Sequence, residues 1–301
     1  MPIPAAVGRH RMRPFPRTPL VLASIVLCIA FASTPAFAAS AALAHIDGGA
    51  IRLGFREGTP PFSFKERDKA RGYSVELCER SMAAIARARH VATPKIEWVA
   101  VDAATRIDAV ASGRVDAVCG TTTITLSRRE RVDFSVPIYV DGGSLMVRTD
   151  AAPVPATLAD LDGKRIAVIG ATTTEAALTR ALALAKAQAT LVHVKDGAEG
   201  VAALLAKRVD GYAGDRIVLT ELRQRSDAAK SLTFLAQDFS YEPYGIVVRR
   251  DDPDFRLALD RALVGIYKSG EIDGIFATWF GDLGRPGPLL NAMFYLNMLP
   301  E

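Results

Sequence analysis

The sequence predicts an α/β fold made of two similar units with a ligand cleft between them. The chain has 301 residues, enough for two domains of roughly 150 residues each. Short apolar runs alternate with helical periodicity, which favours mostly parallel sheets flanked by helices. This alternation begins a second time after about residue 142. Clefts between two such units are where small ligands usually bind.

Residues 1–38 have the three parts of a secretory signal peptide. Four arginines and no acidic residue precede an apolar run at residues 20–32, and Ala36-Phe37-Ala38 offers small residues at a cleavage site. The apolar run of 13 residues is too short to span a bilayer comfortably. We therefore expect cleavage after Ala38 and a periplasmic protein, with an uncleaved N-terminal anchor as the alternative.

Removal of the leader changes the charge and the cysteine content. The net charge falls from +4 to 0 because four arginines are lost. This removes the main argument for nucleic acid as a partner, because phosphate binding needs a retained basic surface. Two cysteines, Cys78 and Cys119, remain in an oxidising compartment. They form either one disulfide or two separately buried thiols, because sequence alone does not give their separation.

The first unit contains alternating strands and helices before residue 142. Val75, Cys78, Met82 and Ile85 recur at helical spacing and predict a helix over residues 73–88. Ser112-Gly113 ends the second predicted helix. The predicted strands are Ile51–Phe55, Ile96–Val101 and Val115–Cys119, and the predicted helices are Tyr73–Ala88 and Arg106–Ala111.

The second unit repeats the pattern, and the chain then returns to the first. Asp252 before Pro253 marks the start of a helix, since proline is tolerated at the first helical position. The predicted strands are Arg165–Ile169, Leu191–Val194, Asp210–Gly214 and Ile246–Arg249. The predicted helices are Thr174–Ala187, Gly200–Lys207, Arg216–Arg225, Asp254–Ser269 and Glu271–Phe280.

These elements divide the chain into a signal peptide and two lobes. We expect the first lobe to comprise residues 39–142 and 244–301, and the second lobe residues 143–243. From Arg285 onward the chain is first rich in proline and glycine and then apolar, which we interpret as a strap packed on the first lobe.

Two threonine-rich segments follow predicted strands and suit anion binding. In residues 119–130, Ser127 and Glu130 have the spacing of a capping box, and Arg128 is a bidentate donor for a carboxylate. In residues 170–175, Thr172 and Glu175 have the same spacing. Helix N-termini attract negative charge. Ordinary turn formation and helix capping remain alternatives for both segments.

The chain resembles the family 3 periplasmic solute-binding proteins of amino-acid ABC importers, and most of all their glutamate/aspartate-binding subgroup. The resemblance extends from about Ile51 to the tail, and its motifs occur in family order. They are Gly54…Pro60-Pro61-Phe62, Gly72-Tyr73, Gly113-Arg114-Val115-Asp116-Ala117, Thr121-x-Thr123-x4-Arg128, Val132-Asp133-Phe134-Ser135, Leu161-Asp162-Gly163-Lys164, Tyr244-Gly245-Ile246 and Trp279-Phe280.

The resemblance implies a two-lobed, type II periplasmic-binding-protein fold that closes on an L-amino acid. It places Arg128, Thr121 and Thr123 on the ligand α-carboxylate and Asp215 on its ammonium group. It also implies contacts from Thr172 and Tyr244. The positions of Arg56 and Arg106 face the ligand side chain, so two arginines there favour glutamate or aspartate.

Two positions depart from the acidic-ligand pattern. The subgroup has a histidine where this chain has Gly197, and a serine where it has Ala103. Two polar contacts to a distal carboxylate are therefore missing, which leaves room for bridging water or for a ligand longer than aspartate.

The sequence also indicates partners and weighs against other functions. We expect a monomer that delivers its ligand to a membrane permease, with no metal, cofactor or nucleic acid. The chain has no nucleophile-elbow sequence and no zinc-ligand spacing. The alternatives are a periplasmic dehydratase-like enzyme on the same scaffold and a ligand-presenting component of a sensor.

Overall fold

The first sheet contains five strands in the order β5-β1-β6-β15-β7. The computed structural model of the protein describes residues 39–281 and 284–301, so the predicted signal peptide lies outside the described residues. Strands β5 and β6 run parallel to β1, whereas β15 is antiparallel to β6 and β7. The strands are β1 (Ala50–Phe55), β5 (Lys95–Ala100), β6 (Ala117–Cys119), β7 (Val132–Phe134) and β15 (Val247–Arg249).

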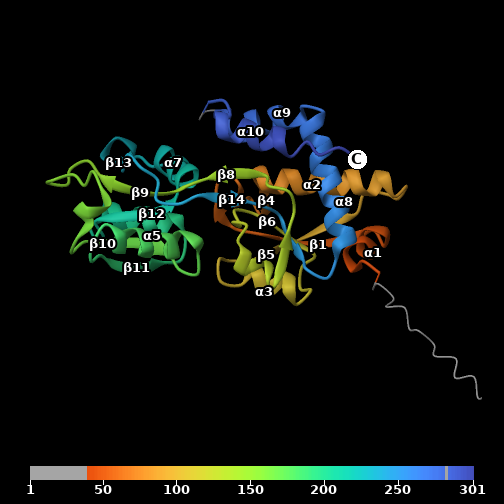
Figure 1. The fold of residues 1–301 in the computed structure, drawn as a ribbon, viewed down its shortest axis with the longest axis horizontal. Helices are drawn as coiled ribbons and strands as arrows, with labels where there is room; N and C mark the ends of the chain where they lie inside the picture. Colours follow the sequence, from red (N-terminus) through yellow and green to blue (C-terminus); the bar gives the residue numbers. More distant parts are fainter. Residues whose placement is uncertain (1–38, 282–283) are drawn as a thin grey trace, which may run out of the picture. The chain divides into compact units, whose positions relative to one another are not determined.

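Helices cover this sheet and share its largest core cluster. In α2, Leu77, Cys78 and Met82 lie on the buried face, and α2 packs beside α8 (Figure 1). Apolar burial of this kind contributes about 25 cal/mol per Å². The helices of this lobe are α1 (Ala41–Asp47), α2 (Tyr73–Ala88), α3 (Arg106–Ala111), α4 (Leu126–Arg129), α8 (Pro253–Lys268), α9 (Glu271–Phe280) and α10 (Pro288–Leu296).

The second sheet has the order β11-β10-β12-β9-β13 and its own apolar clusters. Strands β11 and β12 are parallel to β10, and β9 is antiparallel to β12 and β13. The strands are β9 (Gly143–Arg148), β10 (Arg165–Ile169), β11 (Thr190–Val194), β12 (Gly211–Asp215) and β13 (Leu232–Phe234). The helices are α5 (Thr173–Leu184), α6 (Gly197–Leu205) and α7 (Arg216–Gln224), with short 3-10 turns at Leu158–Leu161 and Ala229–Ser231.

Two further sheets were not predicted. Strands β8 (Tyr139–Asp141) and β14 (Glu242–Tyr244) pair antiparallel where the chain passes from the first sheet to the second and back. A three-stranded sheet joins β2 (Gly58–Thr59), β3 (Ser63–Glu66) and β4 (Lys69–Arg71).

Most predicted helices and strands are present, but several begin or end a few residues away from the predicted positions. Helices α2, α3 and α9 have the predicted bounds. The tail forms helix α10, whose apolar face joins the core of the first lobe. The predicted capping box at Ser127 is wrong, because the side chain of Thr125 caps the helix by accepting a hydrogen bond from the backbone of Arg128. Within the described residues, no helix combines the length and apolar character needed to cross a membrane.

Candidate ligand-binding cleft

A small cavity of about 40 Å³ lies between the strand ends of the two sheets. Residues from both sides line it, and six of the eight residues predicted to bind the ligand are among them. The six are Arg56, Arg106, Thr121, Thr123, Thr172 and Asp215. The other two, Arg128 and Tyr244, lie behind Thr123: the side chain of Arg128 bonds to the carbonyl of Thr123, and Thr123 forms a backbone bridge to Tyr244.

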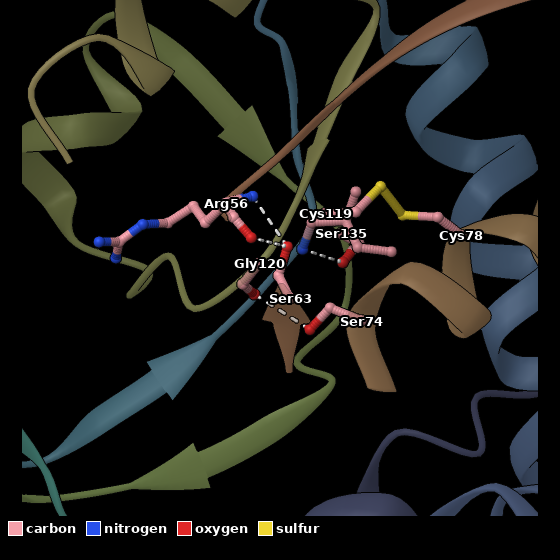
Figure 2. The surroundings of a disulfide bond; sticks show 8 residues. Arg56, Ser63, Ser74, Cys78, Cys119, Gly120 and Ser135 are labelled. Atoms are coloured by element: carbon pink, nitrogen blue, oxygen red, sulfur yellow. Dashed lines mark hydrogen bonds between the residues drawn. A yellow bond between two sulfur atoms is a disulfide. The ribbon is translucent and has the colours of Figure 1, made fainter. Parts of the chain in front are cut away.

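Arg56 directly follows β1 and is held by its backbone. Its N–H donates to the Ser63 hydroxyl (2.8 Å), and that hydroxyl lies 3.1 Å from the Arg56 carbonyl, to which it donates. Figure 2 shows these bonds, with the guanidinium pointing away from the neighbouring disulfide. The residue is 9% exposed, and desolvation lowers the pKa of the Arg56 guanidinium.

Arg106 is the first residue of α3 and is 2% exposed. One terminal nitrogen donates to the Ala103 carbonyl, whereas its Nε has no hydrogen-bond partner among the described residues. Burial, together with repulsion from Arg56 and Arg128, lowers the pKa of Arg106 to about 9. Leaving a charged donor buried and unpartnered costs free energy, so this site favours an anion.

A disulfide fixes the loop that carries Thr121 and Thr123. The Cys78 and Cys119 sulfurs are 2.06 Å apart and link α2 to the end of β6 (Figure 2). The Ser74 hydroxyl adds a hydrogen bond to the Gly120 carbonyl at 3.1 Å. Of the two alternatives left open by the sequence, the structure therefore has the bridge.

Arg128 belongs to the short helix α4 and is half-buried. Its Nη1 donates to the Thr123 carbonyl at 2.8 Å. Desolvation lowers the pKa of Arg128, opposed by the charges of Glu242 and Asp215. The guanidinium lies beside the threonine-rich loop, and it also borders a larger groove on the outer side of Thr123 and Thr173.

The second lobe contributes the N-terminus of α5 and the end of β12. The Thr172 hydroxyl caps α5 by accepting from the Glu175 N–H, and it donates to the Ile169 carbonyl. Asp215 accepts from the Thr174 hydroxyl at 2.8 Å and makes no side-chain cap to α7. Desolvation raises the pKa of Asp215.

Three acidic side chains meet near the two crossing strands, and two of them were missed from the sequence. The Glu242 carboxylate accepts from the hydroxyls of Thr123 and Thr173 at 2.6 and 2.7 Å. Asp141 accepts from the Tyr244 hydroxyl at 3.3 Å, and Asp215 at the end of β12 is the third acid. The only sequence signal that could have indicated Glu242 was its position two residues before Tyr244, a residue predicted to bind the ligand.

Both departures from the acidic-ligand pattern have a structural counterpart. A Cβ at Gly197 would lie 2.5 Å from Leu222 Cδ1, so Leu222 takes the space that a larger side chain needs. Ala103 presents its carbonyl, rather than a side-chain hydroxyl, to Arg106.

The fold and the cleft define a two-lobed binding protein of type II. Two α/β lobes are joined by paired crossing strands, and polar side chains from both lobes line a small cavity. The described residues contain no group of three His, Cys, Asp or Glu side chains placed to hold a metal ion. The chain belongs to the bacterial extracellular solute-binding proteins, family 3, whose sequence model matches residues 51–282.

Individual relatives bind several amino acids. The L-glutamate/L-aspartate-binding protein of Pseudomonas aeruginosa is 31% identical over 234 residues, which is 77% of each chain. An ancestral arginine-binding protein bound to glutamine is 30% identical, with a TM-score of 0.67 over 77% of this chain and 98% of its own. An ancestral amino-acid-binding protein, a precursor of cyclohexadienyl dehydratase, is 27% identical, with a TM-score of 0.68 over 80% and 100%.

Proposed function

We propose that this protein is the periplasmic substrate-binding component of an amino-acid ABC importer and that its ligand is an acidic L-amino acid, glutamate or aspartate. In this proposal the protein is exported by its signal peptide and acts as a monomer. The two lobes close on the amino acid, and a membrane permease then receives it. Membership of the solute-binding family and the glutamate/aspartate-binding relative support this assignment.

The charge balance of the cleft is the observation that carries the choice of ligand. Arg56, Arg106 and Arg128 supply three positive charges, and in the part of the chain that the structure describes none of them has a carboxylate within the 4.0 Å of an ion pair. Asp215 and Glu242 supply two negative charges. These three positive and two negative side chains leave one positive charge, which a ligand of net charge −1 neutralises. A neutral or basic amino acid leaves that charge uncompensated.

The ligand's own groups find matching partners. Arg128 and the N-terminus of α5 suit the α-carboxylate, because both present N–H donors to an anion. The carboxylate of Asp215 suits the ammonium group. Arg56 and Arg106 suit the distal carboxylate, and Arg106 has an unpartnered Nε to offer. A micromolar complex needs about 8 kcal/mol, which a few charged hydrogen bonds supply.

Binding without catalysis is the function we propose. The described residues that line the cavity include one carboxylate, Asp215, and no histidine, so they offer no separate general acid and base. Glu57 is the acid nearest to Arg56 in sequence, but it does not line the cavity. Its side chain is half-exposed, and its Oε1 lies 3.8 Å from Lys65 Nζ.

Calorimetry on the purified, ligand-stripped protein tests the proposal. L-glutamate and L-aspartate are titrated against L-glutamine, L-arginine and simple dicarboxylates. Glutamine has the shape of glutamate without the distal charge, so it is the matched control. We expect glutamate or aspartate to bind at least ten-fold more tightly than glutamine, with no product formed. Equal binding of glutamine, or preference for arginine, would contradict the acidic assignment.

A further inference from the structure

We infer that Glu242 is a latch that holds the two lobes closed by sharing its carboxylate with a hydroxyl from each lobe. Glu242 lies in β14, one of the two crossing strands, and is 2% exposed. Its Oε2 accepts from Thr123 Oγ1 (2.6 Å) and from Thr173 Oγ1 (2.7 Å), and its Oε1 accepts from Ser240 (2.7 Å). The two threonine hydroxyls are 3.0 Å apart.

Thr173 is the partner that comes from the opposite lobe. Thr123 follows β6 of the first sheet and is tied to β14 by a backbone bridge with Tyr244, so it stays beside Glu242 in any lobe position. Thr173 is the first residue of α5, which packs on the second sheet. Separation of the lobes therefore breaks the two contacts of Thr173 and leaves the contact between Thr123 and Glu242 intact.

The chemistry of a buried carboxylate makes this contact costly to lose. An ionised carboxylate only accepts hydrogen bonds, and three hydroxyl donors satisfy it here. Glu242 also lies against the first turn of α5, where the helix dipole favours negative charge. Charged hydrogen bonds of this kind are stronger than neutral ones. The closed form is thus stabilised by a protein carboxylate as well as by a ligand.

The latch acts on lobe closure, whichever amino acid occupies the cleft. It predicts that the ligand-free protein spends a measurable fraction of time closed, and that a bound ligand leaves slowly. Only the second effect rests on the proposed function, because it needs a known ligand.

Three substitutions on α5 separate the latch from general effects on the helix. Thr173→Val removes the hydroxyl and keeps the shape, whereas Thr173→Ser keeps the hydroxyl. Thr179→Val is the matched control, since Thr179 is exposed and donates only to the Glu175 carbonyl of its own helix. Small-angle X-ray scattering of the ligand-free proteins measures lobe opening, and stopped-flow fluorescence measures the release of L-glutamate.

We expect Thr173→Val to be more open than wild type without ligand and to release L-glutamate about ten-fold faster. Thr173→Ser and Thr179→Val should match wild type in both measurements. Scattering of ligand-free wild type that equals that of Thr173→Val would overturn the latch, as would tighter binding by Thr173→Val. If L-glutamate binds to none of the proteins, the proposed ligand is wrong, and the scattering comparison alone decides on the latch.

Discussion

The hydroxyl of Tyr244 lies 3.3 Å from Asp141 Oδ2, so side chains as well as backbones join the crossing strands β8 and β14. The backbone N–H groups of Gly142 and Ile217 also donate to the Asp141 carboxyl group. Burial, together with the charge of Asp215, raises the pKa of Asp141 to about 8. With this pKa, Asp141 carries a proton at neutral pH.

This assignment predicts a stability that falls as the pH rises. The pKa of an unfolded aspartate is about 3.9, so the native state binds the Asp141 proton more tightly than the unfolded state does. The stabilisation is complete below about pH 4 and is lost as the pH rises through about 8. In Asp141→Asn this dependence is absent. Urea unfolding at several pH values should show wild type losing stability relative to the variant between about pH 4 and 8.

The raised pKa of Asp215 also lowers stability as the pH rises, and it does so in both proteins. Parallel curves of unfolding free energy against pH for wild type and Asp141→Asn would show that Asp141 is already ionised in the native protein.

Two arginine substitutions should separate the general clamp from the selectivity for acidic ligands. Arg128→Ala removes the cation next to the α5 N-terminus, so binding of every amino acid should be lost. Arg56→Ala removes a cation expected to face the side chain, so glutamate should lose about 10- to 100-fold in affinity while glutamine changes little. Calorimetry with both ligands measures the two effects.

The exposed Arg180 on α5 provides the control, because Arg180→Ala removes a positive charge near the same helix without entering the cavity. If Arg128→Ala keeps its affinity for glutamate, the role assigned to that residue is wrong.

How far the sequence could predict the structure depends on whether a feature is local. Helices α2 and α3 were predicted with their bounds, because apolar spacing along 6 to 16 residues specifies them. The short strands β2, β3 and β4 were missed, since a strand of 2 to 4 residues has too few positions to show alternation. The start of helix α4, which contains Arg128, was predicted two residues too late, because Thr125 and Ser127 are both good N-cap residues and only the backbone geometry decides between them.

The residues of the candidate site also differ in how far the sequence could predict them. The resemblance to the family implied Arg56, Arg106 and Asp215, and each stands at the end of a predicted element. Glu242 could not be predicted, since its partner Thr173 is 69 residues away in the chain and lies on α5 of the other lobe.

Removal of the disulfide should weaken the fold and loosen the ligand loop. Cys78 and Cys119 are separated by 41 residues, and the chain-entropy estimate for a loop of this length is about 4 kcal/mol, an upper value for most proteins. We expect Cys78→Ala/Cys119→Ala to lose about 2–4 kcal/mol of unfolding free energy in urea. Reductant should lower the stability of wild type only, and a reductant-insensitive wild type would mean that the bridge does not form in solution.

Gly197 and Leu222 should be energetically coupled, because a Cβ at position 197 would lie 2.5 Å from Leu222 Cδ1. Leu222 packs partly buried against the cores of both lobes, so its rotation away from the new methyl group is hindered. Gly197→Ala should cost about 1–2 kcal/mol in wild type. The same change in a Leu222→Ala background should cost less, giving a coupling of at least about 0.5 kcal/mol in a double-mutant cycle measured by urea unfolding. Strict additivity would mean that Leu222 does not fill this space.

Coupling would explain physically why the polar side chain expected at position 197 of an acidic-ligand cleft is absent. It would leave Arg56 and Arg106 to bind the distal carboxylate.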